Sequence, residues 1–168
     1  MFQEPLLFSW LKVLENVMLG YEIKGFKKEQ AKLKAQDLLK KFNLFEYANF
    51  YPDSLSGGMK QKVALLRTIA FNSSILLLDE PFGSLDAITR SSLHLYLLEI
   101  WKKLKLTVIF TTHDIREAIF LSDRVYILSK KPATIIDCLK INLPRPRKTE
   151  DITSKKFVEL EKKLISLL

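Results

Sequence analysis

Cysteine is almost absent from this sequence of 168 residues: Cys138 is the only one, so no disulfide can form within the chain. Long hydrophobic runs are missing too, because none reaches the ~18–20 residues of a membrane-spanning helix. The first residues, Met1 to Pro5, hold no basic stretch ahead of the apolar ones, so we expect no secretory signal. The composition, 48% hydrophobic and 27% charged, is that of one globular domain rather than of a fibre or a disordered tail.

Positive charge is in excess, with 27 Lys and Arg residues against 19 Asp and Glu residues, or +8 at pH 7. Such an excess can attract nucleic acid or anionic lipid headgroups. The lysines are spread along the chain, however, and those between residues 27 and 41 are interrupted by Glu29 and Asp37. This spacing favours the solvated face of a helix, so we expect no nucleic-acid partner.

Hydrophobic spacing predicts an α/β fold. The first third is helical, over about 11–20 and 27–42, and the second helix has one apolar face formed by Ala31, Ala35, Leu38, Leu39 and Phe42. Short apolar strands then alternate with helices: strands at 75–78, 107–111 and 124–128, helices at about 58–71, 86–104 and 114–121. This alternation indicates a parallel sheet with helical crossovers, and the continuous apolar strands indicate that both faces are covered.

The last part of the chain is predicted to begin with a break in regular structure at 143–148, Leu-Pro-Arg-Pro-Arg-Lys. A final helix at about 154–168 follows. Its apolar stripe consists of Phe157, Leu160, Leu164 and Leu168.

Two acids, Asp79 and Glu80, directly follow the strand predicted at 75–78. At the carboxyl end of a parallel strand, side chains face the crevice where ligands bind. One carboxylate there can hold Mg²⁺, and the other can position or deprotonate a water that attacks phosphorus. The alternative is a pair of solvated acids at a strand end.

Ser56, Gly57 and Gly58 open the helix predicted at about 58–71. Glycines let a ligand approach the backbone closely, and the N–H groups at a helix start bind phosphate. Ser56 can cap the helix and can also donate to an oxygen. The alternative is an ordinary serine-capped helix after a glycine turn.

Three further side chains carry weaker signals. His113 follows the strand at 107–111, where it can hydrogen-bond a terminal phosphate, whereas His94 lies in an apolar helical stretch that favours a structural role. Asp86 follows a tight loop and has helix capping as its alternative. The amide of Gln3 can ligate Mg²⁺ or water.

In their order along the chain, these motifs resemble those of the ATP-binding subunit of ABC transporters. Phe2-Gln3-Glu4 resembles the Q-loop, Ser56-Gly57-Gly58 with Gln61 the signature motif, Ile75 to Glu80 Walker B, Ser84-Leu85-Asp86 the D-loop and His113 the switch histidine. The resemblance implies a partial ABC ATPase domain: a P-loop NTPase-type parallel sheet with a helical subdomain. Its parts would be 1–55 with the Q-loop and helical subdomain, 56–130 with the other motifs, and 131–168 as a C-terminal extension.

The resemblance also implies roles for the matched residues, with ATP and Mg²⁺ as the bound groups. Asp79 and Gln3 would hold Mg²⁺, and Glu80 would be the catalytic base, with Gln3 also sensing the attacking water. His113 would contact the terminal phosphate. The residues that would contact the nucleotide bound to the opposite subunit are Ser56, Gly57, Gly58, Gln61 and Asp86.

A closer resemblance is to importers of the nitrate, sulfonate and taurine group. It is carried by Gln3 to Val17, Glu80 to Asp86, Thr112 to Ala118 and Leu143 to Arg147. It implies an ATP-hydrolysing subunit that energises solute uptake from the cytoplasmic face of the cell membrane. Its partners would be a membrane permease that docks on residues 1–55, a second ATP-binding subunit in a dimer and, indirectly, a periplasmic or lipid-anchored solute-binding protein.

One family motif, the Walker A loop Gly-x-x-x-x-Gly-Lys-Ser/Thr, does not occur in this sequence. We therefore expect the chain alone to bind ATP weakly, to hydrolyse it negligibly and to expose an apolar strand edge. Three alternatives stand beside the importer ATPase: a non-catalytic partner that donates the signature motif to a complete subunit, a non-functional gene fragment, and a basic nucleic-acid-binding protein built on an ABC-type ATPase.

Overall fold

The computed structural model describes residues 1–167 and divides the chain into two compact units, Met1–Thr111 and Thr112–Leu168. Each unit is described by itself. The three parts predicted from the motifs, 1–55, 56–130 and 131–168, follow other boundaries and stay a prediction. Among residues 1–167, no helix is both long and apolar enough to cross a membrane.

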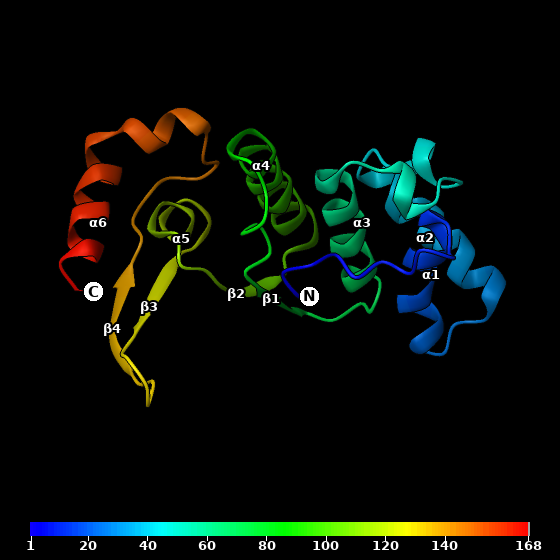
Figure 1. Ribbon diagram of the computed structural model, residues 1–168, viewed down its shortest axis with the longest axis horizontal. Helices are drawn as coiled ribbons and strands as arrows, with labels where there is room; N and C mark the ends of the chain where they lie inside the picture. The colour runs from blue at the N-terminus through cyan, green and yellow to red at the C-terminus, as the bar shows by residue number, and fades with distance from the viewer. Residues whose placement is uncertain (168) are drawn as a thin grey trace. The chain divides into compact units, whose positions relative to one another are not determined.

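The first unit begins with a helical part. It contains α1 (Val13–Ile23), α2 (Lys28–Lys41) and α3 (Gly57–Ile69), together with the short 3₁₀ helices η1 (Phe45–Tyr47) and η2 (Pro52–Ser54). α1 packs against both α2 and α3 (Figure 1). The predicted apolar face of the second helix is confirmed, because Ala31, Ala35, Leu38, Leu39 and Phe42 are all buried.

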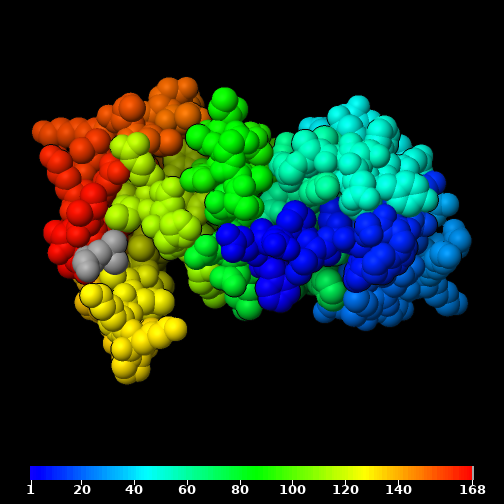
Figure 2. All heavy atoms as spheres, viewed as in Figure 1, coloured from blue at the N-terminus to red at the C-terminus, as the bar shows by residue number. Residues whose placement is uncertain are grey.

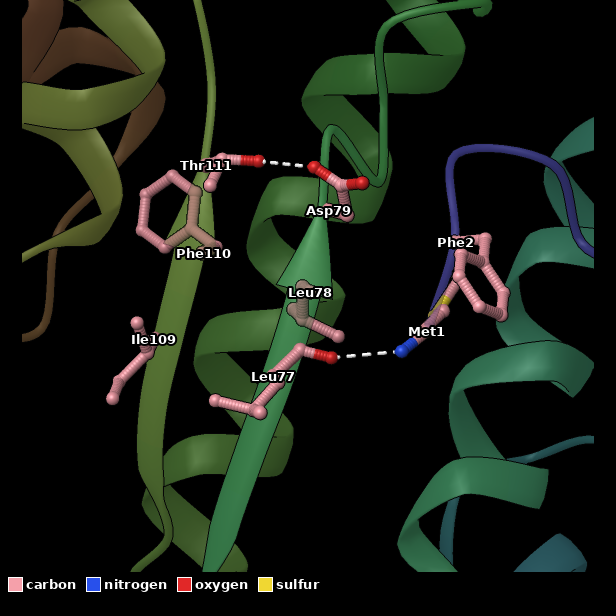
Figure 3. Close-up of a pocket in the computed structure, with 8 residues that line it drawn as sticks. All are labelled: Met1, Phe2, Leu77, Leu78, Asp79, Ile109, Phe110 and Thr111. Carbon is pink, nitrogen blue, oxygen red and sulfur yellow. Dashed lines mark hydrogen bonds between the residues drawn. The ribbon is translucent and has the colours of Figure 1, made fainter. Parts of the chain in front are cut away.

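The rest of the first unit is a βαβ element formed by β1 (Ile75–Asp79), α4 (Ala87–Leu104) and β2 (Thr107–Thr111). The strands pair in parallel from Ile75 opposite Thr107 to Asp79 opposite Thr111, as predicted. Figures 1 and 3 both show α4 beside the two strands. This arrangement brings the carboxyl ends of β1 and β2 together at one edge of the sheet.

This parallel sheet is covered on one face only, so the predicted cover on both faces is wrong for the described residues. Leu76 and Leu78 are buried, whereas Leu77 and Ile109 are 61% and 57% exposed. Side chains alternate between the two faces of a strand, and residues 1–111 place helical cover on just one of them. The predicted free strand edge is partly occupied, because the Met1 amino group donates to the Leu77 carbonyl (2.8 Å) and the Asp79 N–H donates to the Met1 carbonyl (2.9 Å).

The second unit contains an antiparallel hairpin rather than a third parallel strand. Its elements are α5 (Ile115–Leu121), β3 (Arg124–Leu128), β4 (Ile135–Lys140), the 3₁₀ helix η3 (Thr149–Thr153) and α6 (Lys155–Ile165). β3 pairs with β4, a strand that the hydrophobic spacing did not reveal. Their connection spans only residues 129–134, whereas a parallel crossover needs about a dozen residues or more, so a hairpin is the pairing that this length permits.

The core of the second unit lies between α5 and α6. Ile119 and Phe120 of α5 are buried, as are Phe157 and Leu164 of α6. The predicted stripe on the last helix is therefore confirmed at these two positions, while Leu160 is half-buried. Leu168 lies outside the described residues.

Candidate functional site

The acids predicted to carry chemistry lie at the carboxyl end of β1. Asp79 is the last residue of the strand, and the hydroxyl of Thr111, opposite it on β2, donates to Asp79 Oδ1 at 2.6 Å (Figure 3). The Glu80 N–H donates to the carbonyl oxygen of Thr111 at 3.2 Å. The parallel register thus fixes both acids at the edge where ligands bind in such sheets.

Glu80 occupies an uncommon backbone conformation, with φ at +40°. A side chain with a Cβ reaches this left-handed region at a cost of order 1–3 kcal/mol, and such residues cluster at functional sites. The chain then turns through Pro81 towards Gly83. The turn leaves the Glu80 side chain half-buried at the strand end rather than free in solvent.

Gln3 and Glu80 converge on Gly83. A Cβ built on Gly83 would lie 3.1 Å from Gln3 Nε2 and 3.5 Å from Glu80 Oε2. The amide and the carboxylate therefore flank one small residue, although 77 positions separate them along the sequence. The structure thus brings Gln3 to Glu80, which follows Asp79 in the chain, and it adds Thr111 as the partner of Asp79.

Side chains from α1 and α3 hold the backbone of the segment that begins at Gln3 by hydrogen bonds. The Gln61 amide donates to the Gln3 carbonyl at 3.2 Å and also to the Pro81 carbonyl. Arg67 donates to the carbonyls of Pro5 (2.9 Å) and Leu6 (2.6 Å). Through these two bonds the Gln61 amide joins the Q-loop-like segment to the turn after Glu80. The side chain is only 3% exposed, so water does not compete for these bonds. Its contact with a nucleotide stays a prediction.

Asn16 completes this fastening from within α1. Its side chain is fully buried, accepts from the Phe8 N–H at 2.9 Å, and donates to the carbonyls of Phe8, Leu11 and Lys12 at 3.0–3.1 Å. Neither Asn16 nor Arg67 was singled out from the sequence. The only available signal was a polar residue on the buried face of each predicted helix.

A shallow apolar hollow adjoins Asp79. It holds about 300 Å³ and is lined by Met1, Phe2, Leu77, Leu78, Asp79, Ile109, Phe110 and Thr111 (Figure 3). The lining comes from both strands and from the N-terminal residues. The carboxylate of Asp79 and the hydroxyl of Thr111 supply the polar side-chain groups at one end of it.

The predicted phosphate-binding motif forms the start of α3. Ser56 is the N-cap, and its hydroxyl oxygen accepts from the Met59 N–H at 3.4 Å, which confirms the capping role. Ser56 and Gly57 are exposed, and the first turn of this 13-residue helix holds no acidic residue. The free N–H groups in the first turn of a helix attract an anion, and here no acidic side chain competes for them.

Gly58 is required here by close packing. A Cβ on Gly58 would lie 2.6 Å from Thr89 Cγ2 at the start of α4, whereas a Cβ on Gly57 would meet nothing closer than Leu85 Cδ2 at 3.7 Å. The two helix starts therefore touch through Gly58. Ser56, Gly57 and Gly58 form a second group, beside the loop that leads to Asp86.

Asp86 caps α4, which confirms the alternative offered for it. Its Oδ1 accepts from the N–H groups of Thr89 (3.0 Å) and Ile88 (3.1 Å). These bonds, chiefly that from the Thr89 N–H, lower the pKa of the Asp86 carboxyl below its ordinary value. A role for Asp86 in contact between subunits stays a prediction.

The two histidines differ as expected from the sequence. His94 on α4 is 9% exposed and its ring contacts that of Phe82 with centroids 5.1 Å apart, a structural placement. His113 is exposed and directly precedes Asp114, the N-cap of α5. His113 belongs to the second unit, whereas the other predicted site residues belong to the first.

The described residues form no cluster of three His, Cys, Asp or Glu side chains that would enclose a metal. The side-chain oxygen ligands near the strand ends in the described residues are instead the Asp79 and Glu80 carboxylates, the Thr111 hydroxyl and the Gln3 amide. Mg²⁺ commonly keeps several waters and takes only one or two carboxylates together with phosphate oxygens. This donor set fits Mg²⁺ delivered with a nucleotide rather than held in a protein cage.

A family model described as "ABC transporter" matches residues 1–83. The nitrate import ATP-binding protein NrtD of Synechocystis is 43% identical over 148 residues, which cover 88% of this chain and 56% of that protein. The aliphatic sulfonates import ATP-binding protein SsuB of Bacillus cereus is 44% identical over 164 residues, which cover 98% of this chain and 63% of that protein. The chain thus spans less than two thirds of the length of these curated relatives.

The fold is also similar to a solved structure. cbiO1 of Clostridium perfringens, described as part of the ABC transporter complex cbiONQ, matches with a TM-score of 0.73 and 24% identity. The match covers 97% of this chain and 61% of that one. At this identity the likeness speaks for the fold alone.

Proposed function

Because this chain belongs to the ATP-binding proteins of ABC transporters, we propose that it serves in the ATP-binding and ATP-hydrolysing subunit of an importer for a small oxyanion or organic sulfonate. The observation that carries the proposal is the convergence of Gln3 and Glu80 on Gly83 beside Asp79. Phosphoryl transfer needs positioning and charge neutralisation more than covalent chemistry, and these groups supply both.

Each side chain has a distinct task in this proposal. Asp79, oriented by the hydroxyl of Thr111, holds Mg²⁺. Glu80 accepts the proton of the attacking water, and the amide of Gln3 orients that water. When bound, Mg²⁺ neutralises charge on the phosphates of ATP. His113 contacts the terminal phosphate.

Ser56 and the glycines after it serve the nucleotide of a second ATP-binding subunit. The N–H groups of the α3 start and the Ser56 hydroxyl donate to the terminal phosphate. This contact requires a dimer in which the start of α3 faces the partner's nucleotide. Asp86, which caps the neighbouring helix, communicates between the two sites.

The permease docks on an aromatic surface of the first unit, defined by Phe8, Trp10, Phe50 and Tyr51. These side chains are 40%, 70%, 46% and 48% exposed. Backbone bonds from Val13 N–H to the Phe50 carbonyl (2.9 Å) bring the two segments together at the start of α1. Figure 2 shows the N-terminal segment, in blue, on the surface of this unit. Exposed aromatic clusters mark protein interfaces, so the chain would lie at the inner face of the cell membrane.

The test is solute uptake by the source cells after substitution in the chromosomal gene. Glu80→Gln keeps the shape of the side chain but removes the base, so uptake of labelled nitrate or sulfonate should fall at least about a hundredfold. Glu159→Gln, an exposed glutamate on α6 outside the proposed sites, is the matched control and should leave uptake unchanged. Unchanged uptake in Glu80→Gln would refute a catalytic role.

A non-catalytic partner role is the second candidate, because the signature-like motif is exposed at the start of α3. In that case Gly57→Asp should abolish uptake, since it places a negative charge where phosphate would bind and its Cβ makes only ordinary contact with Leu85 Cδ2 at 3.7 Å. Glu80→Gln should then have no effect. If uptake is unchanged in both variants, the catalytic role and the partner role are both excluded.

A further inference from the structure

The segment 143–148 has no task in the proposed nucleotide site, yet its arginines are built into the second unit. The Arg147 side chain is fully buried, and the Arg145 side chain is 20% exposed. Figure 1 shows the chain after β4 running back past α5. Burying a guanidinium is costly unless it is hydrogen-bonded, so its partners indicate what it does.

Both arginines bind the C-terminal end of α5. Arg147 Nη1 donates to the carbonyls of Ile119 (3.1 Å) and Phe120 (2.8 Å). Arg145 Nη2 donates to the carbonyl of Leu121 at 3.0 Å. The last three carbonyls of the helix thus all accept hydrogen bonds from guanidinium groups.

Asp123 adds a counter-charge to this arrangement. Its Oδ1 lies 2.8 Å from Arg145 Nη2 and 3.7 Å from Arg147 Nη2. Burial, followed by repulsion from Arg145, lowers the pKa of Arg147 to about 10, so the group is still charged at neutral pH. Two positive charges therefore stand at the negative end of the α5 dipole.

This contact matters because α5 is short. A helix of seven residues is not stable by itself, and its last carbonyls have no partner within the helix. Ile119, Phe120 and Leu121 are buried, so water cannot easily replace the guanidinium donors. The position of α5 depends on groups outside it.

The other end of α5 begins next to His113. Asp114 Oδ1 accepts from the N–H groups of Arg116 (2.9 Å) and Glu117 (3.1 Å), and this cap fixes the backbone directly after the histidine. A salt bridge also joins Arg116 Nε to Glu161 Oε1 on α6 at 2.7 Å, but both side chains are partly exposed. The arginine contacts at the C-terminal end are the more buried restraint.

We propose that Arg145 and Arg147 are positioning residues that set the orientation of His113 by holding the C-terminal end of α5. The inference rests on the proposed function only for what His113 then contacts. The two arginines act through the short helix and touch no reacting atom.

The experiment uses the full 168-residue chain with ¹³C- and ¹⁵N-labelled histidine, observed by NMR without nucleotide. The chain contains two histidines, so His94 in the first unit serves as the internal reference. The variants are Arg145→Ala and Arg147→Lys. Arg124→Gln, which removes an exposed charge from the start of β3, is the matched control.

The expected result is a shifted or broadened His113 signal in both arginine variants, with His94 unchanged and with the control like the parent chain. Amide exchange in α5 should become about ten- to a hundredfold faster, the loss expected for a hydrogen bond to a charged donor. Amides of β3 and β4 should keep their protection. That selectivity separates positioning from general destabilisation of the unit.

Two outcomes would overturn the proposal: faster α5 exchange with an unchanged His113 signal, or no change in either. If β3 and β4 lose protection in a variant, that variant has destabilised the whole unit. Arg145→Lys, which keeps the charge and one donor, is then measured in its place and judged by the same criteria. Since no nucleotide is present, these outcomes do not depend on ATP binding. Failure of the proposed function is seen separately, as unchanged uptake in Glu80→Gln.

Discussion

Gly58→Ala is a sharp test of the contact between α3 and α4. The new Cβ would lie 2.6 Å from Thr89 Cγ2, whereas carbon atoms in good contact lie about 3.5–4.0 Å apart. The neighbour is a methyl on a β-branched side chain, which cannot swing away easily. The helix starts must therefore separate by roughly 1 Å, and overpacking of this kind costs about 1–3 kcal/mol.

A gain in helix propensity offsets part of this cost. Alanine is favoured over glycine by up to about 1 kcal/mol inside a helix, and by less in the first turn. We therefore expect Gly58→Ala to lower the free energy of unfolding by about 1–2 kcal/mol. Gly57→Ala is the matched control, because its Cβ would make only ordinary contact with Leu85 Cδ2 at 3.7 Å.

The decisive comparison is made in a Thr89→Ser background. Serine removes the Cγ2 methyl, and the next atom of residue 89 is its Cβ at 4.0 Å from the new methyl of Gly58→Ala. The clash then disappears, so the second substitution should cost little or even stabilise. Urea unfolding followed by the fluorescence of Trp10 and Trp101, which both lie in the same unit as Gly58, gives both differences.

The double-mutant cycle has one result that would refute this reasoning. If Gly58→Ala costs the same in both backgrounds, within about 0.5 kcal/mol, the Thr89 methyl is not the cause. The cycle also separates two needs for glycine. Uptake that remains lost in the double variant, although stability is restored, shows that a ligand as well as a helix must approach Gly58.

Four further outcomes are expected. Asn16→Ala should lower the free energy of unfolding by about 2–4 kcal/mol, because three carbonyls lose their donor; a loss under 1 kcal/mol in urea unfolding would contradict this. Gly83→Ala should reduce uptake while the urea midpoint stays nearly unchanged, since the one tight contact of its Cβ is with the flexible amide of Gln3 at 3.1 Å and the Glu80 oxygens lie at ordinary contact distances of 3.5 and 3.7 Å; unfolding would contradict it. Ser56→Asp should keep the α3 cap but abolish uptake, because a carboxylate accepts from the helix and repels phosphate; retained uptake would exclude a phosphate contact there. The Asp86 carboxyl has a lowered pKa in the fold, so its contribution is present above its unfolded value and is lost as pH falls through the folded one; Asp86→Asn should therefore flatten the pH dependence of the urea midpoint below about pH 4, and an unchanged slope would contradict the assigned cap.

Local rules were enough for the main helices, for β1 and β2, and for placing the two acids at a strand end. A 3.6-residue apolar period identifies α2, and an apolar strand followed by acids places Asp79 and Glu80 at a strand end. These features depend on residues close together in the sequence. The parallel pairing of β1 with β2 follows from the helix between them, which is long enough for a crossover.

Contacts to backbone carbonyls were beyond the reach of such rules. Asn16, Arg67 and Arg147 each bind carbonyl oxygens of a distant or irregular segment, and every residue type supplies such an oxygen. A sequence shows the donor but not its acceptor. β4 was missed for a related reason: five of its six residues are exposed, so no buried face gives it an apolar alternation.

The alternatives weighed for Ser56 prove compatible once donors and acceptors are counted. Its hydroxyl oxygen accepts from the Met59 N–H, which is the capping role. A hydroxyl also carries one hydrogen, and capping uses only a lone pair, so the same group can cap α3 and donate to a phosphate. Gly58 follows the same logic, because the absent side chain both admits Thr89 and leaves the helix start open. A structural role found at a motif residue is therefore no evidence against a functional one; only substitutions that remove one role and keep the other can separate them.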